Sequence, residues 1–422
     1  MGRLAVLAAL VAAAALPASS GARSDRALDD VAVRGEVRVL VVLATWGPEP
    51  FTRAQADRVV FDETDAFFRE SSYGRVSLAG AVTPWITAFA AEPRCDPLRV
   101  ARAARAAAAE AGYDTFAYDY VVYLHPVLDC GWSGLSMANE ILLNGELFRK
   151  LVAHELGHGF GLYHANTVQC GGLGCSATEY GDQYGTMGSG DGDLNSYEKY
   201  RLGWLRRIAW GSRNRTVDID RLERASNGPK ALVVTTAAEQ YWIENRRGPL
   251  RSDAGQLLEP GVLVRVGPPR VYPNGRVVVT ASDTLVDDPA GRGRAVLRVG
   301  ERFALRGAFA VTVVKAGARA RLRFRWTDTT PPRAPRGVLT EETFDGRLQV
   351  TWEDAVEAGS GVARYEVLID GVRRGKLTAR AGRENVVHLA RPRAGRRVVA
   401  VVAVDRAGNR SVATTRRFTA GS

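Results

Sequence analysis

One segment near the middle of the chain constrains its fold and chemistry more than any other: His154-Glu155-Leu156-Gly157-His158-Gly159-Phe160-Gly161-Leu162-Tyr163-His164. His154 and His158 are four residues apart, so on a helix both imidazoles lie on one face and reach one metal ion. Gly161 accepts a backbone conformation that a β-carbon opposes, so it ends the helix and brings His164 back as a third ligand. Three histidine ligands leave one coordination position open, which is typical of a catalytic zinc site.

Glu155 follows the first of these ligands and is placed to act as a general base. A bound zinc ion lowers the pKa of a coordinated water to about 7, and Glu155 would take the proton of that water during hydrolysis. The alternative is a buried helix whose histidines hydrogen-bond to one another. The chain contains five histidines in 422 residues and three of them fall in this segment, so we predict a Zn²⁺ site.

A second segment resembles a feature of the metzincin zinc peptidases. Those enzymes carry a methionine in a tight turn beneath the metal, and here Tyr184-Gly185-Thr186-Met187-Gly188 follows the third histidine. Within the metzincins, three further segments resemble the gametolysin-like peptidases: Glu179-Tyr180-Gly181-Asp182, Ser72-Tyr73-Gly74 and Tyr200-Arg201-Leu202-Gly203-Trp204. The resemblance covers residues 36–210 well and residues 211–328 more loosely.

The resemblance implies a secreted zinc endopeptidase with an α/β (α+β) catalytic domain. It implies that a protein or peptide substrate lies extended along the segment before the zinc helix, for which Ser133–Asn139 is our candidate. Some metzincins place a tyrosine two residues after the methionine as an extra ligand. Ser189 occupies that position here, so we expect no such ligand.

The apolar periodicity agrees with that catalytic fold. We expect strands at Val37–Ala44, Val76–Ala81 and Val121–Leu124, helices at Arg53–Glu70, Asp96–Gly112, Glu146–Gly159 and Asp193–Gly203, and an irregular segment at Gly131–Leu143. Asp191–Asn195 resembles the start of a calcium loop, but Ser196 and Leu202 occupy the positions of its glycine and bidentate glutamate, so a helix cap is expected. We interpret His125 as a packed or hydrogen-bonded histidine and His388 as exposed.

The rest of the chain has the pattern of β-domains. Short apolar runs at Ala231–Thr235, Tyr241–Glu244, Gly261–Val266, Arg276–Thr280 and Ala310–Lys315 predict an all-β sandwich. After Pro331, Pro332 and Pro335, which indicate a linker, strands are expected at Leu348–Trp352, Arg364–Ile369 and Arg397–Asp405. Trp352, Tyr365 and Ala403–Asn409 resemble a fibronectin type III module, although Arg396-Arg397 stands where such modules often carry a tyrosine.

These observations predict a multidomain protein. The expected segments are a signal peptide (1–22), a short N-terminal segment (23–35), a zinc peptidase catalytic domain (36–209), a β-sandwich (210–328) and a fibronectin type III-like domain (331–422). Arg3, the apolar stretch Leu4–Leu16 and the small residues Ser20-Gly21-Ala22 indicate the secretory signal. The segment 23–35 is too short to fold into an inhibitory domain, so we expect activity upon secretion; the alternative is a short aspartate plug.

The four cysteines fit an oxidising extracellular compartment. Three pairings are possible; we favour Cys95–Cys130 and Cys170–Cys175. A second zinc site is the alternative, but the spacing of these cysteines matches no common zinc motif. No later segment is long and apolar enough for a transmembrane helix, and we expect a monomer.

Charged residues are distributed unevenly along the chain. The net formal charge is +11; residues 23–209 carry 18 Lys and Arg against 24 Asp and Glu, whereas residues 210–422 carry 38 against 22. This asymmetry has two interpretations. Either it is compositional, with the charged residues spread over solvated strand faces, or the basic C-terminal half attaches the protein to an acidic cell-wall or matrix polymer. Nucleic acid is not an expected partner, because no nucleic-acid-binding motif accompanies the arginines.

Two competing functions remain open from the sequence. One is a secreted surface-binding protein with an inactive or non-peptidase zinc domain, although no residue of the zinc motif is missing. The other is hydrolysis of a non-peptide amide by the same zinc chemistry.

Overall fold

The computed structural model describes residues 32–171, 174–247, 255, 257–267, 284–286, 290–380 and 384–421. These residues fall into two compact units. The first comprises Arg34–Arg69 and Gly74–Gly161; the second comprises Glu70–Tyr73 and the chain from Leu162 onward, with a few residues before Arg34. The predicted signal peptide, most of segment 23–35 and the predicted strand Arg276–Thr280 lie outside the described residues.

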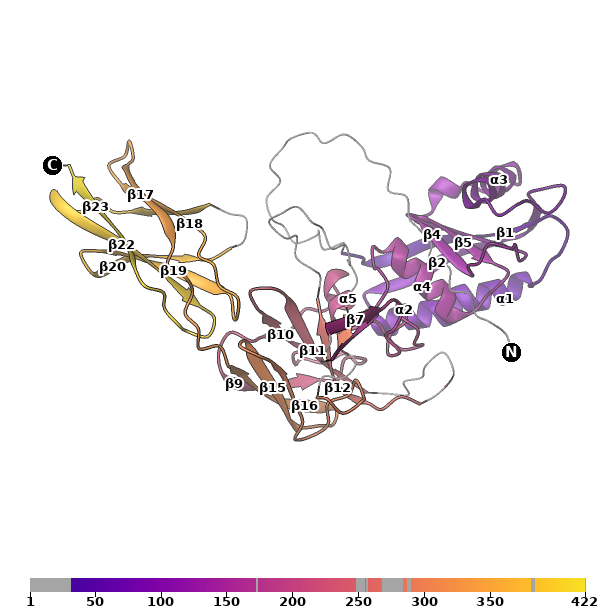
Figure 1. Ribbon diagram of the computed structural model, residues 1–422. Coiled ribbons are helices and arrows are strands. Elements are labelled where there is room, and N and C mark those ends of the chain that lie inside the picture. The colour runs from indigo at the N-terminus through magenta and orange to yellow at the C-terminus, as the bar shows by residue number, and fades with distance from the viewer. Residues whose placement is uncertain are drawn as a thin grey trace. The chain divides into compact units, whose positions relative to one another are not determined.

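The first unit is built on a five-stranded sheet with strand order β2-β1-β3-β5-β4 (Figure 1). Its strands are β1 (Gly35–Thr45), β2 (Val76–Thr87), β3 (Tyr120–His125), β4 (Gly134–Met137) and β5 (Glu140–Asn144). β1 pairs in parallel with β2 and β3, and β3 pairs in parallel with β5. β4 runs antiparallel to β5 and ends the sheet, so one edge of this sheet is a short antiparallel strand.

Helices cover both faces of this sheet, which explains why β1 is a nearly continuous apolar run. On one face, Leu40 and Val42 of β1 pack with Ala104 and Ala108 of α3 (Pro97–Glu110). Asp96 caps α3 by accepting a hydrogen bond from the Arg99 N–H. The helices on the other face are α1 (Arg53–Asp57), the π-helical segment η1 (Arg58–Thr64), α2 (Asp65–Ser71) and α4 (Arg149–Gly159). The first three together form the helix predicted at Arg53–Glu70, and a 3₁₀ turn, η2 (Thr115–Ala117), precedes β3.

The prediction that residues 131–143 are irregular is wrong. They include β4 and most of β5, which form an antiparallel hairpin with Gly134 opposite Leu143 and Met137 opposite Glu140. The apolar periodicity of the sequence did not reveal β4, because this strand has only four residues. All four are half-buried, so they lack the alternation that marks a longer strand. The hairpin gives the sheet its edge, which is where a substrate strand was expected.

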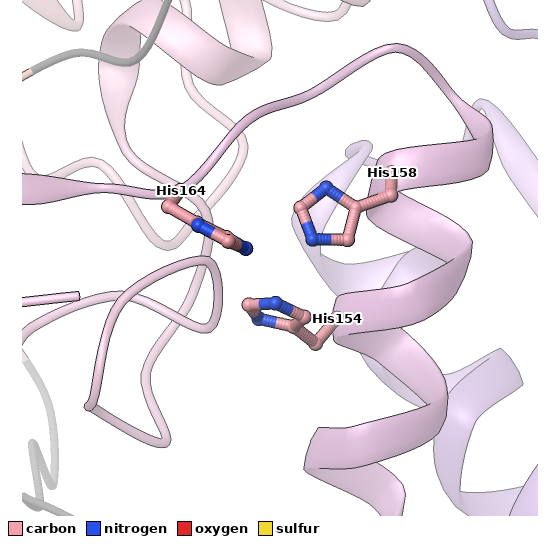
Figure 2. Close-up of side chains that lie close together, drawn as sticks. All are labelled: His154, His158 and His164. Atoms are coloured by element: carbon pink, nitrogen blue, oxygen red, sulfur yellow. The ribbon is translucent and has the colours of Figure 1, made fainter. Parts of the chain in front are cut away.

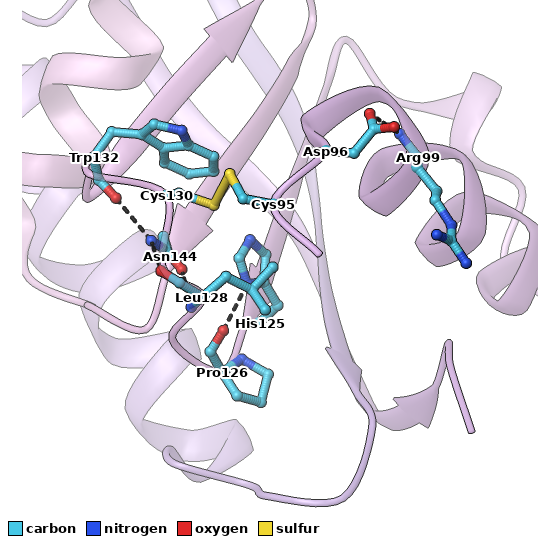
Figure 3. Close-up of a disulfide and its surroundings, with 9 residues drawn as sticks. All are labelled: Cys95, Asp96, Arg99, His125, Pro126, Leu128, Cys130, Trp132 and Asn144. Carbon is cyan, nitrogen blue, oxygen red and sulfur yellow. Dashed lines mark hydrogen bonds between the residues drawn. A yellow bond between two sulfur atoms is a disulfide. The ribbon is translucent and has the colours of Figure 1, made fainter. Parts of the chain in front are cut away.

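A disulfide joins Cys95 and Cys130, as predicted (Figure 3). The bond ties the segment before α3 to the loop between β3 and β4. Asn144, the last residue of β5, binds the same loop: it accepts a hydrogen bond from the Leu128 N–H at 2.6 Å and donates to the Trp132 carbonyl at 2.8 Å. His125 is fully buried with Nδ1 2.7 Å from the Pro126 carbonyl, which confirms a packed histidine. The disulfide and the hydrogen bonds of Asn144 therefore both hold the loop that leads into β4.

The second unit contains a seven-stranded sheet, with order β7-β6-β13-β12-β11-β10-β8, and a four-stranded sheet, with order β14-β15-β16-β9. The strands are β6 (Asn166–Gly171), β7 (Gly174–Thr178), β8 (Ala209–Trp210), β9 (Arg215–Asp220), β10 (Ala231–Thr235), β11 (Gln240–Arg246), β12 (Gly261–Val266), β13 (Thr284–Val286), β14 (Arg302–Leu305), β15 (Phe309–Lys315) and β16 (Arg319–Trp326). Leu232, Val234 and Ile243 pack with Val311 and Phe324 in one core, so the two sheets form the predicted sandwich.

The sandwich begins earlier in the chain than we predicted. β6 and β7 lie in the range predicted as catalytic domain, yet β6 pairs with β13 and so joins the seven-stranded sheet. Cys170 of β6 lies opposite Cys175 of β7 in the hairpin. The predicted bond between these two cysteines falls on side chains outside the described residues.

The same unit contains a short helix, α5 (Ser196–Arg201). Asn195 and Glu198 form a capping box at its start. The prediction of a helix cap at this position is therefore confirmed.

The C-terminal part of the chain forms another sandwich. A three-stranded sheet, β17-β18-β21, packs with a four-stranded sheet, β20-β19-β22-β23, around one apolar core. Trp352 and Tyr365 contact each other in this core at a ring-centroid distance of 5.3 Å, and His388 is exposed as predicted. The strands are β17 (Arg336–Glu342), β18 (Leu348–Glu353), β19 (Val362–Ile369), β20 (Val372–Thr378), β21 (Asn385–Leu389), β22 (Gly395–Asp405) and β23 (Thr414–Ala420). No helix among the described residues is long and apolar enough to cross a membrane.

Candidate metal centre

The helix α4 carries the first two candidate ligands on a buried scaffold. Leu151, Val152, Ala153 and Leu156 are buried along it, so its apolar residues fix the helix within the first unit. Its last residue, Gly159, has no room for a side chain, because a β-carbon there would lie 2.6 Å from Cε1 of Tyr120. The Tyr120 hydroxyl donates to the Gly159 carbonyl at 3.0 Å. The end of the helix is therefore held in place.

The three histidines of the motif converge (Figure 2). The His154 and His158 rings are 4.7 Å apart and perpendicular. The chain turns at Gly161, whose φ of +88° lies in the region that a β-carbon disfavours. One ligand nitrogen from each of His154, His158 and His164 lies within 4.8 Å of the others. The structure thus brings together the three residues that the spacing predicted.

Two residues that directly follow the β6–β7 hairpin hold His164. Its Nδ1 lies 2.8 Å from Oε1 of Glu179, and its ring packs on Tyr180 at a centroid distance of 3.7 Å. Burial lowers the pKa of His164, and Glu179 opposes this shift. A carboxylate that accepts from Nδ1–H leaves the Nε2 lone pair as the one that can coordinate a metal, which is the usual arrangement at histidine metal sites.

Glu155 is a buried carboxylate with no hydrogen bond to any residue that the structure describes. It is 5% exposed, and burial raises its pKa to about 8. Gly134 of the edge strand makes room for it: a β-carbon at Gly134 would lie 2.5 Å from Oε1 and 2.7 Å from Cγ of Glu155. The carboxylate therefore lies directly against the backbone of β4.

Met187 lies in a tight turn, as the resemblance implied. The Gly188 N–H donates to the Gly185 carbonyl at 3.0 Å, and the Met187 side chain is fully buried. The Met187 carbonyl accepts from the N–H of Ala165 at 2.9 Å. Because Ala165 follows His164 directly, this turn holds the backbone that carries the third candidate ligand.

The donor set fits a zinc ion. Imidazole suits zinc and other divalent first-row metals, and three such ligands leave a position for water or substrate. A buried carboxylate beside the first ligand adds a proton acceptor. This arrangement can perform metal-assisted hydrolysis.

Sequence reasoning did not assign roles to four residues that shape this site. Glu179 and Tyr180 were noted only as part of a family motif, and Gly134 only as part of a candidate substrate segment. Asp182 was treated in the same way, although its carboxylate is fully buried and binds Arg265. No spacing rule reveals these contacts, because each joins segments that meet only through the fold.

Comparisons with known proteins add independent information. The model of the gametolysin peptidase M11 family matches residues 51–239. No curated protein matches the chain.

Among solved structures, the Clostridium perfringens spore cortex lytic enzyme SleM matches with 18% identity and a TM-score of 0.19, over 26% of this chain and 35% of that one. The central fibronectin-III array of RIM-binding protein matches with 17% identity and a TM-score of 0.19, over 22% of this chain and 36% of that one. The fibronectin(III)-like modules of Clostridium thermocellum CbhA match with 20% identity and a TM-score of 0.16, over 22% of this chain and 91% of that one.

This chain spans about a third of the first two of these structures. TM-scores this low carry no argument about the fold. The family match is different, because it covers the histidine motif, the Met187 turn and the preceding helices. It supports a gametolysin-like metallopeptidase over residues 51–239 of the chain.

Proposed function

We propose that this protein is a secreted, zinc-dependent endopeptidase of the metzincin type. The observation that carries the proposal is the convergence of three histidine nitrogens within 4.8 Å beside a buried glutamate. Two further features support it: the tight turn at Met187 and a mixed sheet whose edge strand β4 is antiparallel to its neighbour.

In this proposal His154, His158 and His164 hold the zinc ion, and each other residue has a role defined by its position. A zinc ion bound there would supply an acidified water and polarise the scissile carbonyl. Glu155 takes a proton at its carboxylate and passes it to the departing amine. Burial raises the pKa of the Glu155 carboxyl, which favours its uptake of a proton. Glu179 orients His164 by accepting from its Nδ1–H.

The substrate is expected to bind as an added strand beside β4. Within the described sheet β4 pairs with β5 on one side and is the last strand on the other. An extended peptide can pair with such an edge through backbone hydrogen bonds. Gly134 lies on this strand against the Glu155 carboxylate, so a peptide bound there would pass close to the general base. Residues Ser133–Asn139 remain our proposed binding segment.

The experiment is cleavage of casein by the purified protein, with and without a metal chelator. The proposal requires cleavage that the chelator abolishes and that added zinc restores. An inactive surface-binding protein would show no cleavage, and an enzyme for non-peptide amides would leave casein intact while retaining metal. Cleavage that resists the chelator would contradict a metal-dependent mechanism.

A further inference from the structure

Seven charged side chains form a buried cluster next to the Met187 turn, all within the second unit. We call this set the ion network; its members are Asp182, Asp193, Lys199, Glu223, Glu244, Arg246 and Arg265. The side chains of Glu244, Arg246 and Arg265 are fully buried. Taking charges out of water is expensive unless each has partners, so a cluster of this kind calls for an explanation.

Arg265 anchors one end of the loop that contains Met187. Its Nη1 donates to Oδ2 of Asp182 at 2.6 Å, and its Nε donates to Oε1 of Glu244 at 2.9 Å. Asp182 in turn connects three segments: its N–H donates to the Ala165 carbonyl, its carbonyl accepts from the Gly190 N–H, and Oδ1 accepts from the Tyr184 N–H. Fixing Asp182 therefore fixes the loop next to the His164 segment.

Arg246 and Glu244 anchor the other end of the loop. Nη2 of Arg246 donates to the carbonyls of Tyr184 and Asp193, both at 2.9 Å. Glu244 accepts from the Ser196 N–H at 2.7 Å, at the start of α5. Burial alone would raise the pKa of Glu244, but Arg265 and Arg246 outweigh it and lower the pKa to about 2. Glu244 is therefore charged and forms an ion pair with each of the two arginines.

Residues 182–193 lie outside the named helices and strands. Their shape therefore depends on the loop's own backbone hydrogen bonds and on the side chains that bind its backbone. All three anchoring side chains come from β11 and β12, beyond the boundary at residue 209 predicted for the catalytic domain.

We infer that Arg246 and Arg265 are positioning residues of the metal site. They hold the Met187 turn and, through the backbone bonds of Asp182 and Met187 to Ala165, the segment that carries His164. The inference rests on the proposed function and deepens it, because it makes the β-sandwich part of the metallopeptidase machinery.

The test replaces Arg265 with lysine in the full chain. Lysine keeps the positive charge but lacks the planar fork that binds Asp182 and Glu244 together. Glu223→Gln is a milder second variant, because glutamine can still accept from Arg246. Arg321→Lys is the matched control, since Arg321 also binds a carboxylate through two nitrogens but on the exposed face of β16. Each protein is loaded with Co²⁺, and its absorption spectrum, Co²⁺ affinity and thermal midpoint are measured.

We expect Arg265→Lys to alter the Co²⁺ spectrum and weaken Co²⁺ binding by about tenfold, with a smaller change for Glu223→Gln and none for Arg321→Lys. If both network variants lower the thermal midpoint but leave the spectrum and affinity as in the wild type, the network is only structural and the inference is wrong. If Arg265→Lys does not fold, Glu223→Gln decides by the same two readouts. Failure of the wild type to bind Co²⁺ or cleave protein would refute the proposed function instead.

A different observation concerns the outer face of the four-stranded sheet. Side chains of β16 alternate, with Arg319, Arg321, Arg323 and Arg325 exposed and the residues between them buried. Arg319 and Arg321 pair with Asp220 and Asp218. In the part of the chain that the structure describes, Arg323, Arg325 and the exposed Arg302 of β14 have no acidic partner. We call these three residues the arginine face.

The register places the arginine face in a compact array. Arg302 lies opposite Thr312, which lies opposite Arg323, so the two arginines are two strands apart, about 10 Å. Arg323 and Arg325 are about 7 Å apart along the strand. The aromatic side chains of these strands, Phe303, Phe309, Phe324 and Trp326, all pack in the core. The face therefore offers cations without the stacking platform typical of single-stranded nucleic-acid binding.

The geometry points to an anionic polysaccharide as the partner of the arginine face. The test compares retention on immobilised heparin and on immobilised single-stranded DNA. The variant carries alanine at Arg302, Arg323 and Arg325; a control with the same loss of charge carries alanine at three exposed arginines of the C-terminal sandwich, Arg374, Arg393 and Arg417.

We expect the wild type and the control to elute from heparin at similar salt, and the arginine-face variant to elute at clearly lower salt. Equal shifts in both variants would mean that total charge alone drives binding and would overturn the proposal. Tighter retention on DNA, lost in the same variant, would also overturn it in favour of nucleic acid.

Discussion

Gly134→Ala tests the contact between the edge strand and the general base. The added β-carbon would lie 2.5 Å from Oε1 and 2.8 Å from Cδ of Glu155. Reaching an ordinary contact of 3.4 Å requires shifts of about 0.9 Å and about 0.6 Å for these atoms. The backbone at Gly134 is not in the left-handed region, so the clash with Glu155 is the main effect expected.

The size of the effect follows from that displacement. A misplacement of about 1 Å at a reacting group can cost about 100-fold in rate, which corresponds to about 2.7 kcal/mol of activation free energy. We therefore expect kcat/KM for a fluorogenic peptide to fall about 100-fold. Bound zinc should be unchanged, because the three histidines do not contact the new methyl group.

Overpacking also costs about 1–3 kcal/mol of stability, so a control must separate stability from positioning. Leu142→Ala serves, because Leu142 is fully buried in the core with α3, on the opposite face of the same sheet. It should lower the thermal midpoint but leave kcat/KM nearly unchanged well below that midpoint. If Gly134→Ala retained kcat/KM within threefold of wild type, the placement of Glu155 against β4 would be wrong.

Three further predictions follow from other parts of the structure. Glu179→Ala should weaken zinc binding by about tenfold, because His164 loses the acceptor at its Nδ1; an unchanged affinity in a competition titration would contradict this role. Glu244 should contribute stability above its unfolded pKa of about 4.5 that is lost as the pH falls towards about 2, since its folded pKa is the lower one. Urea unfolding of wild type and Glu244→Gln should therefore show a smaller loss of stability on acidification in the variant, and equal losses would refute the assignment. Removal of residues 331–422 should leave peptide hydrolysis nearly unchanged. Truncation after residue 209 should abolish hydrolysis, because the fragment lacks Arg246 and Arg265; an active fragment would refute the role assigned to these two arginines.

Local features of the site could be predicted from the sequence. His154 and His158 are related by one helical turn, so their shared face follows from helix geometry alone. Gly161 has the positive φ that the motif requires. The apolar run of β1 and the cap of α5 were predicted for the same reason: each depends on residues a few positions apart.

The remaining features depend on contacts between distant segments. Asp182 and Arg265 are 83 residues apart, and neither residue's neighbourhood indicates a buried ion pair. Glu179 reaches His164 only because β6 and β7 form a hairpin between them. The predicted boundary at residue 209 did not anticipate that β6 joins the sheet of the following segment, since pairing between strands far apart in the chain leaves no periodic signal in the sequence.

The central claim is that Glu155 acts as the base at a metal held by three histidines. Its most direct test is Glu155→Gln, with zinc content and peptide hydrolysis measured on the same purified sample. The amide keeps the size of the side chain but cannot accept the proton. We expect about one zinc per chain in both proteins and a loss of most hydrolytic activity in the variant. Activity within a few-fold of wild type, or active wild-type protein without a transition metal, would contradict the mechanism.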